Sequence, residues 1–387
     1  MHAIPVTPDL ISGALDSEVT PRGGIRVHRL PRWVREQFPD PQLMMAAGQP
    51  AGVRVAFVTS ATVVELVVHA TRVGYRGFER PRGSIELAVD GVVLDRSVLS
   101  GGDVYETDLR TGQVDLVRGD VHVARFEGLS ALSKRVEIWL PHNESVELLE
   151  LRADEAAVPA PSAGPVWVHH GSSISQGSNA TSPTGTWVAV AAQRAGVDLR
   201  NLGVGGSAAV DPFMARVIRD TPADLISLKL GINVVNLDAM RRRAFVPALH
   251  GFLDTIREGH PRTPIVVISP LYAAIHENTV GPTIIDPASF DTGRASFVAA
   301  GDADETSGRL TLRVVRDLLA TLVQERQRDD AALQYLDGTV LYGEADAQAR
   351  PLPDGLHPDS ATHRVIGERF ADFAFAADGP FAGLRWN

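Results

Sequence analysis

The N-terminal part of the chain consists of short segments in which apolar and polar residues alternate. A period of two places every second side chain on one face, which is typical of half-buried strands. Asp90-Gly91 accepts the positive φ values of a type I′ turn and predicts a hairpin between two of these segments. Because no convincing helical pattern intervenes, we expect residues 1–157 to form an all-β, jelly-roll-like sandwich. The predicted strands are at 52–58, 63–68, 84–89, 92–95, 135–140 and 146–151.

A different pattern begins after the Pro- and Gly-rich stretch 158–165, which we interpret as a linker. Apolar strands now alternate with segments of helical periodicity. This alternation favours an α/β domain at 164–387, with a parallel sheet covered on both faces and functional sites at the carboxyl ends of its strands. We predict strands at 166–170, 199–204, 224–230, 264–271 and 334–341, and helices near 186–195, 211–219, 238–258, 306–328 and 360–376.

Composition narrows the classes of function. A chain of 387 residues fits two domains, and a net charge of -10 argues against nucleic acid as a partner. The absence of cysteine excludes disulfides, thiolate metal ligands and a cysteine nucleophile. The first residues do not resemble a secretory signal, and no apolar run approaches the ~18 residues of a membrane span. We therefore expect a cytoplasmic protein without a membrane partner.

The sequence Asp354-Gly355-Leu356-His357-Pro358 near the C-terminus offers the clearest chemistry. A carboxylate and an imidazole three residues apart on one turn can hydrogen-bond to each other. Such a carboxylate fixes the tautomer of the imidazole and stabilises the imidazolium that forms when the ring takes a proton from a nucleophile. Asp354 and His357 are therefore candidates for the orienting carboxylate and the general base.

The candidate nucleophile is Ser173, in a Gly- and Ser-rich loop after the first predicted strand of the second domain. A Walker A loop is excluded, because five residues separate Gly171 from Gly177 and no Lys follows. The Gly-x-Ser-x-Gly elbow is excluded because Ser175 replaces its last glycine. A hydroxyl at the entry of a helix has backbone amides nearby that can bind an oxyanion. A solvated turn is the alternative interpretation.

Two further candidates follow the next strands. Gly206 could present its amide, and Asn233 its side-chain amide, to a developing negative charge. The run from Gly203 to Ala208 also matches the Gly-x-Gly-x-x-Ala fingerprint of dinucleotide-binding proteins, with Asp224 downstream. A dinucleotide-binding protein therefore stays open as an alternative.

Ser, Gly, Asn and Asp-x-x-His occur in this order at strand ends or just beyond the last strand, and in this respect the chain resembles the SGNH (GDSL) hydrolase superfamily over roughly residues 164–377. The resemblance implies a flavodoxin-like parallel sheet and a Ser-His-Asp triad. Ser173 would be the nucleophile, His357 the general base and Asp354 its partner. The oxyanion hole would comprise the amides of Ser173 and Gly206 and the side chain of Asn233. The resemblance requires no metal and no bound cofactor.

The chain departs from the family pattern in two places. The usual Gly-Asp-Ser is Gly171-Ser172-Ser173, and the usual Gly-x-Asn-Asp ends in Val234. Both changes remove a carboxylate near the site. We expect the less anionic surroundings to favour an acidic or aromatic acyl group.

The expected sandwich at 1–157 resembles carbohydrate-binding modules. A β-sandwich before such a domain is similar to two-domain carbohydrate esterases and to GDSL-type acyltransferases that move a salicylyl group to a tetracycline hydroxyl. We expect an O-acyltransferase of the second kind, with a small-molecule acyl donor, acyl-CoA, and a polyketide-type hydroxyl acceptor in antibiotic biosynthesis. The alternative is an esterase of small acyl or carbohydrate esters. A dinucleotide- or carbohydrate-binding protein without hydrolase chemistry is a second alternative.

Other polar and aromatic residues favour structural roles. His169 and His170 lie beside the candidate nucleophile but have no carboxylate at fixed spacing, and Trp139 is expected in the core. No His, Asp and Glu cluster has metal-ligand spacing. The aperiodic segments 273–305 and 344–353 are expected to form the acyl or acceptor pocket.

Overall fold

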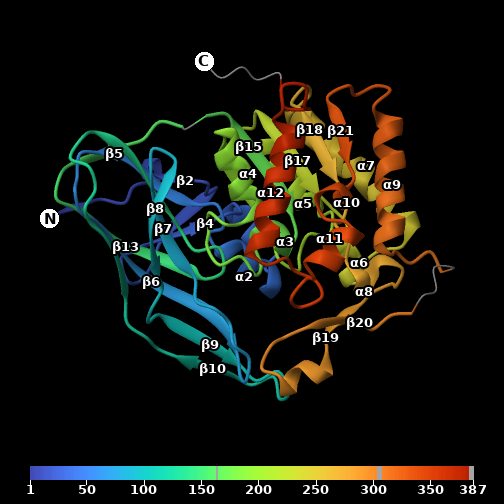
Figure 1. Cartoon of the computed structure of the whole chain (residues 1–387), viewed down its shortest axis with the longest axis horizontal. Helices are drawn as coiled ribbons and strands as arrows, with labels where there is room; N and C mark the ends of the chain where they lie inside the picture. Colours follow the sequence, from blue (N-terminus) through green and yellow to red (C-terminus); the bar gives the residue numbers. More distant parts are fainter. Residues whose placement is uncertain (163, 303–306, 383–387) are drawn as a thin grey trace. The chain divides into compact units, whose positions relative to one another are not determined.

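The computed structural model describes residues 1–162, 164–302 and 307–382. The chain divides into two compact units, one of Met1–Ala163 with Thr181–Gly185 and one of Gly164–Ala180 with Thr186–Asn387 (Figure 1). The predicted second domain, 164–387, includes residues 383–387, which lie outside the described part of the chain.

The described residues of the first unit form an eight-stranded and a six-stranded sheet. The two sheets share one hydrophobic core, to which β6 contributes every second residue, including Val64, Leu66 and Val68. The predicted hairpin is confirmed, because β7 pairs with β8 and Asp90 and Gly91 have φ of 48° and 82°. The eight-stranded sheet comprises β1 (His2–Ile4), β3 (Asp16–Val19), β4 (Ile25–His28), β6 (Val64–Tyr75), β9 (Asp103–Thr107), β10 (Val114–Val117), β11 (His122–Phe126) and β13 (Ser145–Ala153). The six-stranded sheet comprises β2 (Ile11–Ser12), β5 (Arg54–Thr59), β7 (Ser84–Val89), β8 (Val92–Val98), β12 (Lys134–Trp139) and β14 (Ala157–Pro159).

The first unit also contains two short helices that the sequence analysis did not predict, α1 (Arg32–Gln37) and α2 (Pro41–Gly48). Asp40 caps the start of α2 with its side chain, which satisfies an amide that the helix itself cannot. Arg29 is fully buried and donates to the carbonyl oxygen of Gln49 at the other end of α2 (2.6 Å). Burial lowers the pKa of this guanidinium to about 9. Another difference is β14, which pairs with β5 inside the segment interpreted as a linker.

The second unit has a mixed α/β structure with a parallel sheet, as predicted. Its described strands have the order β16-β15-β17-β18-β21, so the first strand in the sequence lies second in the sheet, as in flavodoxin-like folds. All four strand pairs are parallel. The strands are β15 (Val166–Gly171), β16 (Asp198–Gly203), β17 (Leu225–Lys229), β18 (Ile265–Ile268) and β21 (Leu333–Leu336).

Helices cover both faces of this sheet. On one face, α4 (Trp187–Ala195) packs against α12 (Ser360–Ala374), which crosses the strands in Figure 1. Trp167 of β15 stacks on Phe370 of α12, with ring centroids 5.3 Å apart. Aromatic pairs of this kind contribute about 0.5–1.5 kcal/mol beyond the area they bury. The other long helices, which we assign to the opposite face, are α5 (Pro212–Asp220), α7 (Arg242–Gly259) and α9 (Leu312–Arg326).

Several short elements of the second unit were not located by periodicity, although a helix was expected to begin near Ser173. The segment expected to be a strand at 334–341 ends early and turns into α10, and the segment 273–302 contains a small helix and a two-stranded hairpin; its continuation, 303–306, is outside the described residues. These elements have three to six residues. They are α3 (Ser173–Gln176), α6 (Ile232–Asn236), α8 (Ala274–Glu277), α10 (Gly338–Leu341), α11 (Glu344–Ala349), β19 (Thr283–Ile285) and β20 (Phe297–Ala299).

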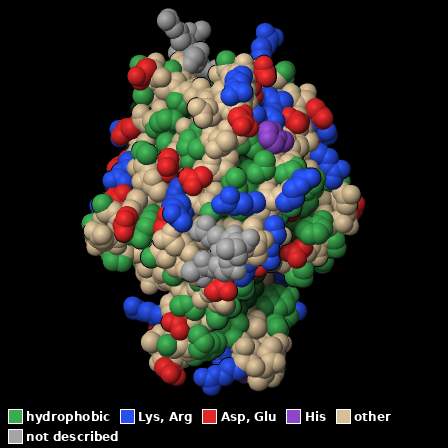
Figure 2. Space-filling model, turned by 90° about the vertical axis from the view of Figure 1, so that its right-hand side faces the viewer, with side chains coloured by type: hydrophobic (Ala, Val, Ile, Leu, Met, Phe, Trp, Pro, Cys, Tyr) green, Lys and Arg blue, Asp and Glu red, His purple; other side chains and the backbone are tan. Residues whose placement is uncertain are grey.

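The face drawn in Figure 2 carries described acidic, basic and hydrophobic side chains that are interspersed. This mixture differs from the continuous basic surface that is typical of proteins that bind a phosphate backbone.

Candidate active site

Ser173 lies where the first parallel strand ends. The buried strand β15 leads through Ser172 into α3, whose first residue is Ser173. This short helix packs closely against the end of β16, because a Cβ on Gly203 would lie 2.6 Å from the amide nitrogen of Gln176. A glycine at this position therefore allows the approach that holds Ser173 at the edge of the sheet.

The structure brings Ser173 together with Asp354 and His357, which precede α12. The hydroxyl of Ser173 lies 2.8 Å from Nε2 of His357. Nδ1 of His357 lies 2.8 Å from Oδ2 of Asp354. Gly355, between the two site residues, has φ of 80°, a conformation that glycine adopts without strain. The three predicted side chains thus form one continuous hydrogen-bonded line.

Both carboxylate oxygens of Asp354 accept hydrogen bonds. Oδ1 accepts from the backbone amides of His357 (2.7 Å) and Leu356 (2.9 Å), and Oδ2 accepts from Nδ2 of Asn179 (3.0 Å). Burial acts to raise the pKa of Asp354, but the hydrogen bond and charge of His357, with the two amides, outweigh it and lower this pKa. The carboxylate is therefore held in its charged form, as a partner of an imidazolium must be.

Asn179 is a site residue that the sequence analysis missed. It has φ of 66°, a left-handed conformation that asparagine adopts more readily than most residues. An isolated Asn after a Ser-rich loop gives no sequence signal for this role. Its contact with Asp354 joins the loop after α3 to the loop before α12.

The three predicted oxyanion donors, Ser173, Gly206 and Asn233, follow the ends of three neighbouring parallel strands, β15, β16 and β17. The amide of Ser173 is in the first turn of α3, where an amide has no acceptor within the helix. A Cβ on Gly205 would lie 3.4 Å from Cβ of Ser173, so the Gly205-Gly206 turn passes beside the serine. Oδ1 of Asn233 accepts from the amide of Ala208 (3.1 Å), which orients the amide group of the side chain and ties it to the same loop.

The dinucleotide fingerprint does not have the structural context that its function needs. The fingerprint glycines should open a helix directly after the strand, so that the pyrophosphate meets the helix N-terminus. Here α5 begins only at Pro212. The amide of Gly205 is already donated to the side chain of Gln176 (2.7 Å).

His169 and His170 have structural roles. His169 is fully buried, with Nδ1 2.7 Å from the hydroxyl of Ser227 and Nε2 2.7 Å from that of Ser175. Burial keeps the pKa of His169 well below its ordinary value, with a smaller effect of neighbouring cationic groups. Nδ1 of His170 lies 2.9 Å from the carbonyl oxygen of Leu202. Neither ring lies in the line formed by Ser173, His357 and Asp354.

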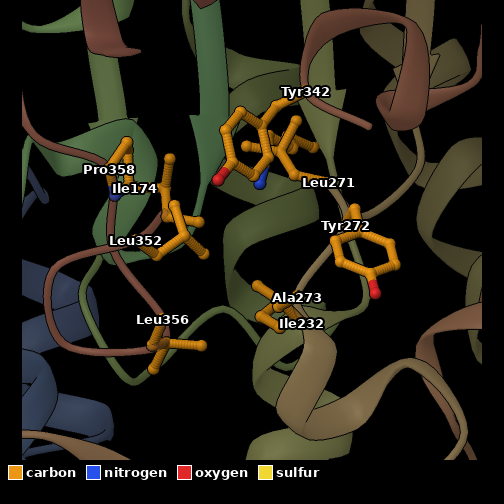
Figure 3. A pocket seen from close by; sticks show the side chains of 10 residues that line it. Ile174, Ile232, Leu271, Tyr272, Ala273, Tyr342, Leu352, Leu356 and Pro358 are labelled. Atoms are coloured by element: carbon orange, nitrogen blue, oxygen red, sulfur yellow. The ribbon is translucent and has the colours of Figure 1, made fainter. Parts of the chain in front are cut away.

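A small pocket adjoins the site (Figure 3). Its empty volume is about 280 Å³, including space open to solvent. Apart from Lys229, its lining residues are aliphatic or aromatic, with Tyr272 and Tyr342 on one side and Leu352 on another. Part of the lining comes from residues adjacent in sequence to the site residues. They are Ile174, Ile232, Leu356 and Pro358.

The aperiodic segment after β18 contributes to the surroundings of His357. The ring of Phe297 in β20 meets that of His357 edge to face, with centroids 5.6 Å apart. The amide of Phe297 donates to the carbonyl oxygen of Asp354 (2.9 Å). Ala273 and Leu352 line the pocket, so each of the two segments expected there contributes a residue to its lining.

Outside this region, Trp139 is 3% exposed and lies under the guanidinium of Arg54 at 4.9 Å, in agreement with its expected core position. Among the described residues, no group of His, Asp and Glu could hold a metal ion. In the same part of the chain, no helix is long and apolar enough to cross a membrane.

Comparison with known sequences identifies the class. The sequence matches the GDSL-like Lipase/Acylhydrolase family over residues 170–365, and the chain belongs to that family. The protein is therefore an enzyme of the SGNH/GDSL hydrolase class. No curated protein sequence matches the chain at a significant level.

Solved structures resemble the chain over almost its whole length. The salicylyl-acyltransferase SsfX3 from a tetracycline biosynthetic pathway has 26% identity and a TM-score of 0.76, with 95% of each chain covered. A GDSL-like lipase from Bacteroides ovatus has 19% identity and a TM-score of 0.64, with 93% of each chain covered. A family two carbohydrate esterase from Clostridium thermocellum has 14% identity and a TM-score of 0.54, covering 83% of this chain and 90% of its own. The last two, at lower identity, show similarity of fold alone.

Proposed function

We propose that the protein is a serine-dependent O-acyltransferase that forms an acyl-Ser173 intermediate. The observation that carries this proposal is the line from the Ser173 hydroxyl through His357 to Asp354, with 2.8 Å at each of its two contacts. A serine, an imidazole and a buried carboxylate in this order can activate an oxygen nucleophile. We assign Ser173 as the nucleophile, His357 as the general base and Asp354 as the residue that orients the imidazole.

In the first half of the reaction, Oγ of Ser173 attacks the acyl carbonyl carbon of a thioester while Nε2 of His357 accepts the hydroxyl proton. The amides of Ser173 and Gly206 and the side chain of Asn233 bind the oxyanion, each contributing on the order of 10²–10³ in rate. The carbon–sulfur bond then breaks, and the thiolate leaves with the proton from His357. The product is an acyl-Ser173 ester and a free thiol.

In the second half, an acceptor hydroxyl attacks the acyl-enzyme. His357 removes its proton, the bond between the acyl carbon and Oγ of Ser173 breaks, and the proton returns to the serine. Water in the same position would give hydrolysis, so access to the acyl-enzyme decides between the two outcomes.

The acyl donor that we propose is an aromatic, salicylyl-like acyl-CoA, and the acceptor is a hydroxyl of a polyketide or tetracycline-type natural product. Support comes from the apolar pocket beside the site and from the similarity to a salicylyl-acyltransferase over 95% of the chain. Because acyl-CoA is an intracellular donor, the proposal includes a cytoplasmic location and a role in antibiotic biosynthesis. It also includes a catalytic domain at 164–387 preceded by a β-sandwich at 1–157.

Labelling with a fluorophosphonate probe tests the chemistry first. We expect the wild-type protein to be labelled at Ser173, and both Ser173→Ala and His357→Ala to lose the label. Purified protein is then given aromatic acyl thioesters with and without a tetracycline-type alcohol, and thiol release and ester formation are followed separately. The transferase is supported if ester forms and thiol release accelerates when the alcohol is added.

A carboxylic ester hydrolase is the second candidate, because the fold is shared with a family two carbohydrate esterase. It predicts fast turnover of aryl or sugar acetates in water without an acceptor. Rapid hydrolysis with no ester formed from any alcohol would replace the transferase by this candidate. Absence of labelling at Ser173 in folded protein would refute both.

A further inference from the structure

A lysine at the end of β17 is the one cation among the residues that line the small pocket described above. Lys229 is the last residue of this strand and is 1% exposed. Its Nζ is buried and makes no hydrogen bond to any residue that the structure describes. Buried ammonium groups are normally paired, because each has three donors and a high cost of leaving water.

The pKa of Lys229 agrees with this lack of a partner, because no nearby carboxylate among the described residues offsets the effect of burial. Burial lowers its pKa to about 8, so the group is still mostly protonated at neutral pH. The charge acts on its surroundings, because Lys229 is among the groups that lower the pKa values of His169 and His363. A charged group with unused donors beside an apolar pocket is suited to bind an acceptor oxygen that enters with a ligand.

The position of the pocket indicates which ligand that is. Its lining includes residues adjacent in sequence to Ser173, Asn233 and His357, so a group that fills it is close to the acyl carbon. The aromatic rings of Tyr272 and Tyr342 on its wall suit a flat or aliphatic body (Figure 3). The hydroxyl of Tyr342 is already donated to the carbonyl oxygen of Arg350 (2.7 Å).

We propose that Lys229 determines the acyl specificity of the enzyme by binding an oxygen acceptor carried on an apolar acyl group, such as a phenolic hydroxyl or a carboxylate. This inference rests on the proposed acyl-Ser173 chemistry and names the substrate class of the same site. Lys229 is a specificity residue that touches the acyl group, and it takes no part in the proton transfers.

The test measures thiol release from paired thioesters, which reports acylation of Ser173 whether the acyl group is later transferred or hydrolysed. The pairs are 2-hydroxybenzoyl against benzoyl, and succinyl against butyryl. For the wild-type protein we expect a higher kcat/KM for the oxygen-bearing member of at least one pair. In Lys229→Met, which keeps the length of the side chain without its charge, this ratio should fall by about ten- to hundredfold. The pair that responds identifies the acceptor as a phenol or a carboxylate.

Leu352→Ala is the matched control, because it enlarges the same pocket without changing its charge. It should alter both members of a pair alike and leave their ratio within about threefold. If Lys229→Met does not fold, the wild-type protein supplies a second measurement. Free 2-hydroxybenzamide should then protect Ser173 from the fluorophosphonate at lower concentration than benzamide, or succinamide at lower concentration than butyramide.

Equal ratios in wild type and Lys229→Met, or equal protection by both amides of each pair, would overturn the assignment of Lys229 while acylation of Ser173 stands. Absence of both labelling and thiol release in the wild-type protein would instead remove the proposed function, and this inference with it.

Discussion

The carboxylate of Asp354 accepts hydrogen bonds from its own turn and from a segment far away in the sequence. The distant donor is Asn179. Nδ2 of Asn179 donates to Oδ2 (3.0 Å), the same oxygen that accepts from Nδ1 of His357. Asn179 is therefore a positioning residue: it holds the carboxylate of Asp354 and has no assigned contact with the acyl group. Displacing this carboxylate would let the imidazole rotate away from Ser173.

We predict that Asn179→Ala lowers kcat by roughly tenfold with little change in KM, because a small loss of alignment affects the proton transfer more than substrate binding. Steady-state thiol release from an aromatic thioester measures both constants. Ser178→Ala is the control, a neighbouring change away from the carboxylate that should leave kcat within about twofold. An increase in KM at constant kcat would contradict the positioning role.

At the residue scale, the sequence predicted those side chains whose spacing has a chemical meaning. Asp354 and His357 are three positions apart, and the structure places them in contact with each other and His357 in contact with Ser173. Asn179 and Lys229 could not be found in this way. The hydrogen bond from Asn179 to Asp354 and the burial of Lys229 beside the pocket are produced by the fold and not by the local sequence. Burial of an unpaired lysine in particular is a property of tertiary packing and leaves no local pattern.

At the scale of elements, hydrophobic periodicity located the parallel strands and the long helices that the structure describes in the second unit. It made the strand at 334–341 too long and began the helix at 306–328 too early, because α9 starts at Leu312. It did not find α3, α6 or α10, because a helix of four or five residues spans little more than one turn and shows no period. Each of these short helices begins just after a strand ends, so its position follows from that of the strand. Two of them, α3 and α6, carry Ser173 and Asn233, so residue types indicated these two candidate positions where periodicity indicated no element.

Helix α12 is fixed to α4 by a buried histidine that the mechanism does not use. Nε2 of His363 donates to the carbonyl oxygen of Ser178 (2.9 Å), and Nδ1 accepts from the amide of Trp187 (3.2 Å). The bond accepted by Nδ1 requires the neutral ring, because both nitrogens of a protonated imidazole are donors. Burial, with smaller charge effects, lowers the pKa of His363 to about 4, below the ordinary value near 6.5.

We predict that the free energy of unfolding decreases as pH falls from 6.5 toward 4, because over this range the unfolded chain binds a proton at His363 that the folded protein does not. The complete effect of one such group is about 3 kcal/mol. His363→Gln preserves one donor and one acceptor but does not titrate, so its loss of stability with acidification should be smaller. Urea unfolding of both proteins between pH 4.5 and 7.5 measures this difference, and identical slopes would show that His363 is not the responsible group.

At the scale of the whole molecule, the two compact units are not separated by a single cut in the sequence. Thr181–Gly185, between α3 and α4, belongs to the first unit although the residues on both sides belong to the second. Within the first unit, the amide and hydroxyl of Thr184 donate to Oε2 of Glu86 (3.1 and 2.5 Å), and this carboxylate is 5% exposed. Hydrogen bonds to a charged group contribute about 1.5–3 kcal/mol each.

We therefore predict that a fragment beginning at Gly164 is less stable than the complete chain, because it retains the 181–185 segment but lacks Glu86. Its unfolding temperature should be lower by more than about 5 °C, since each 1 kcal/mol shifts this temperature by about 2–4 °C in a domain of this size. Thermal unfolding followed by circular dichroism measures the stability of the fragment. The rate of Ser173 labelling measures whether its active site is intact. Glu86→Ala in the full chain should show part of the same loss, and Glu86→Gln, which keeps an acceptor oxygen, less of it. A fragment that unfolds at the temperature of the full chain and is labelled at the same rate would show that the second unit does not need the hydrogen bonds between Thr184 and Glu86.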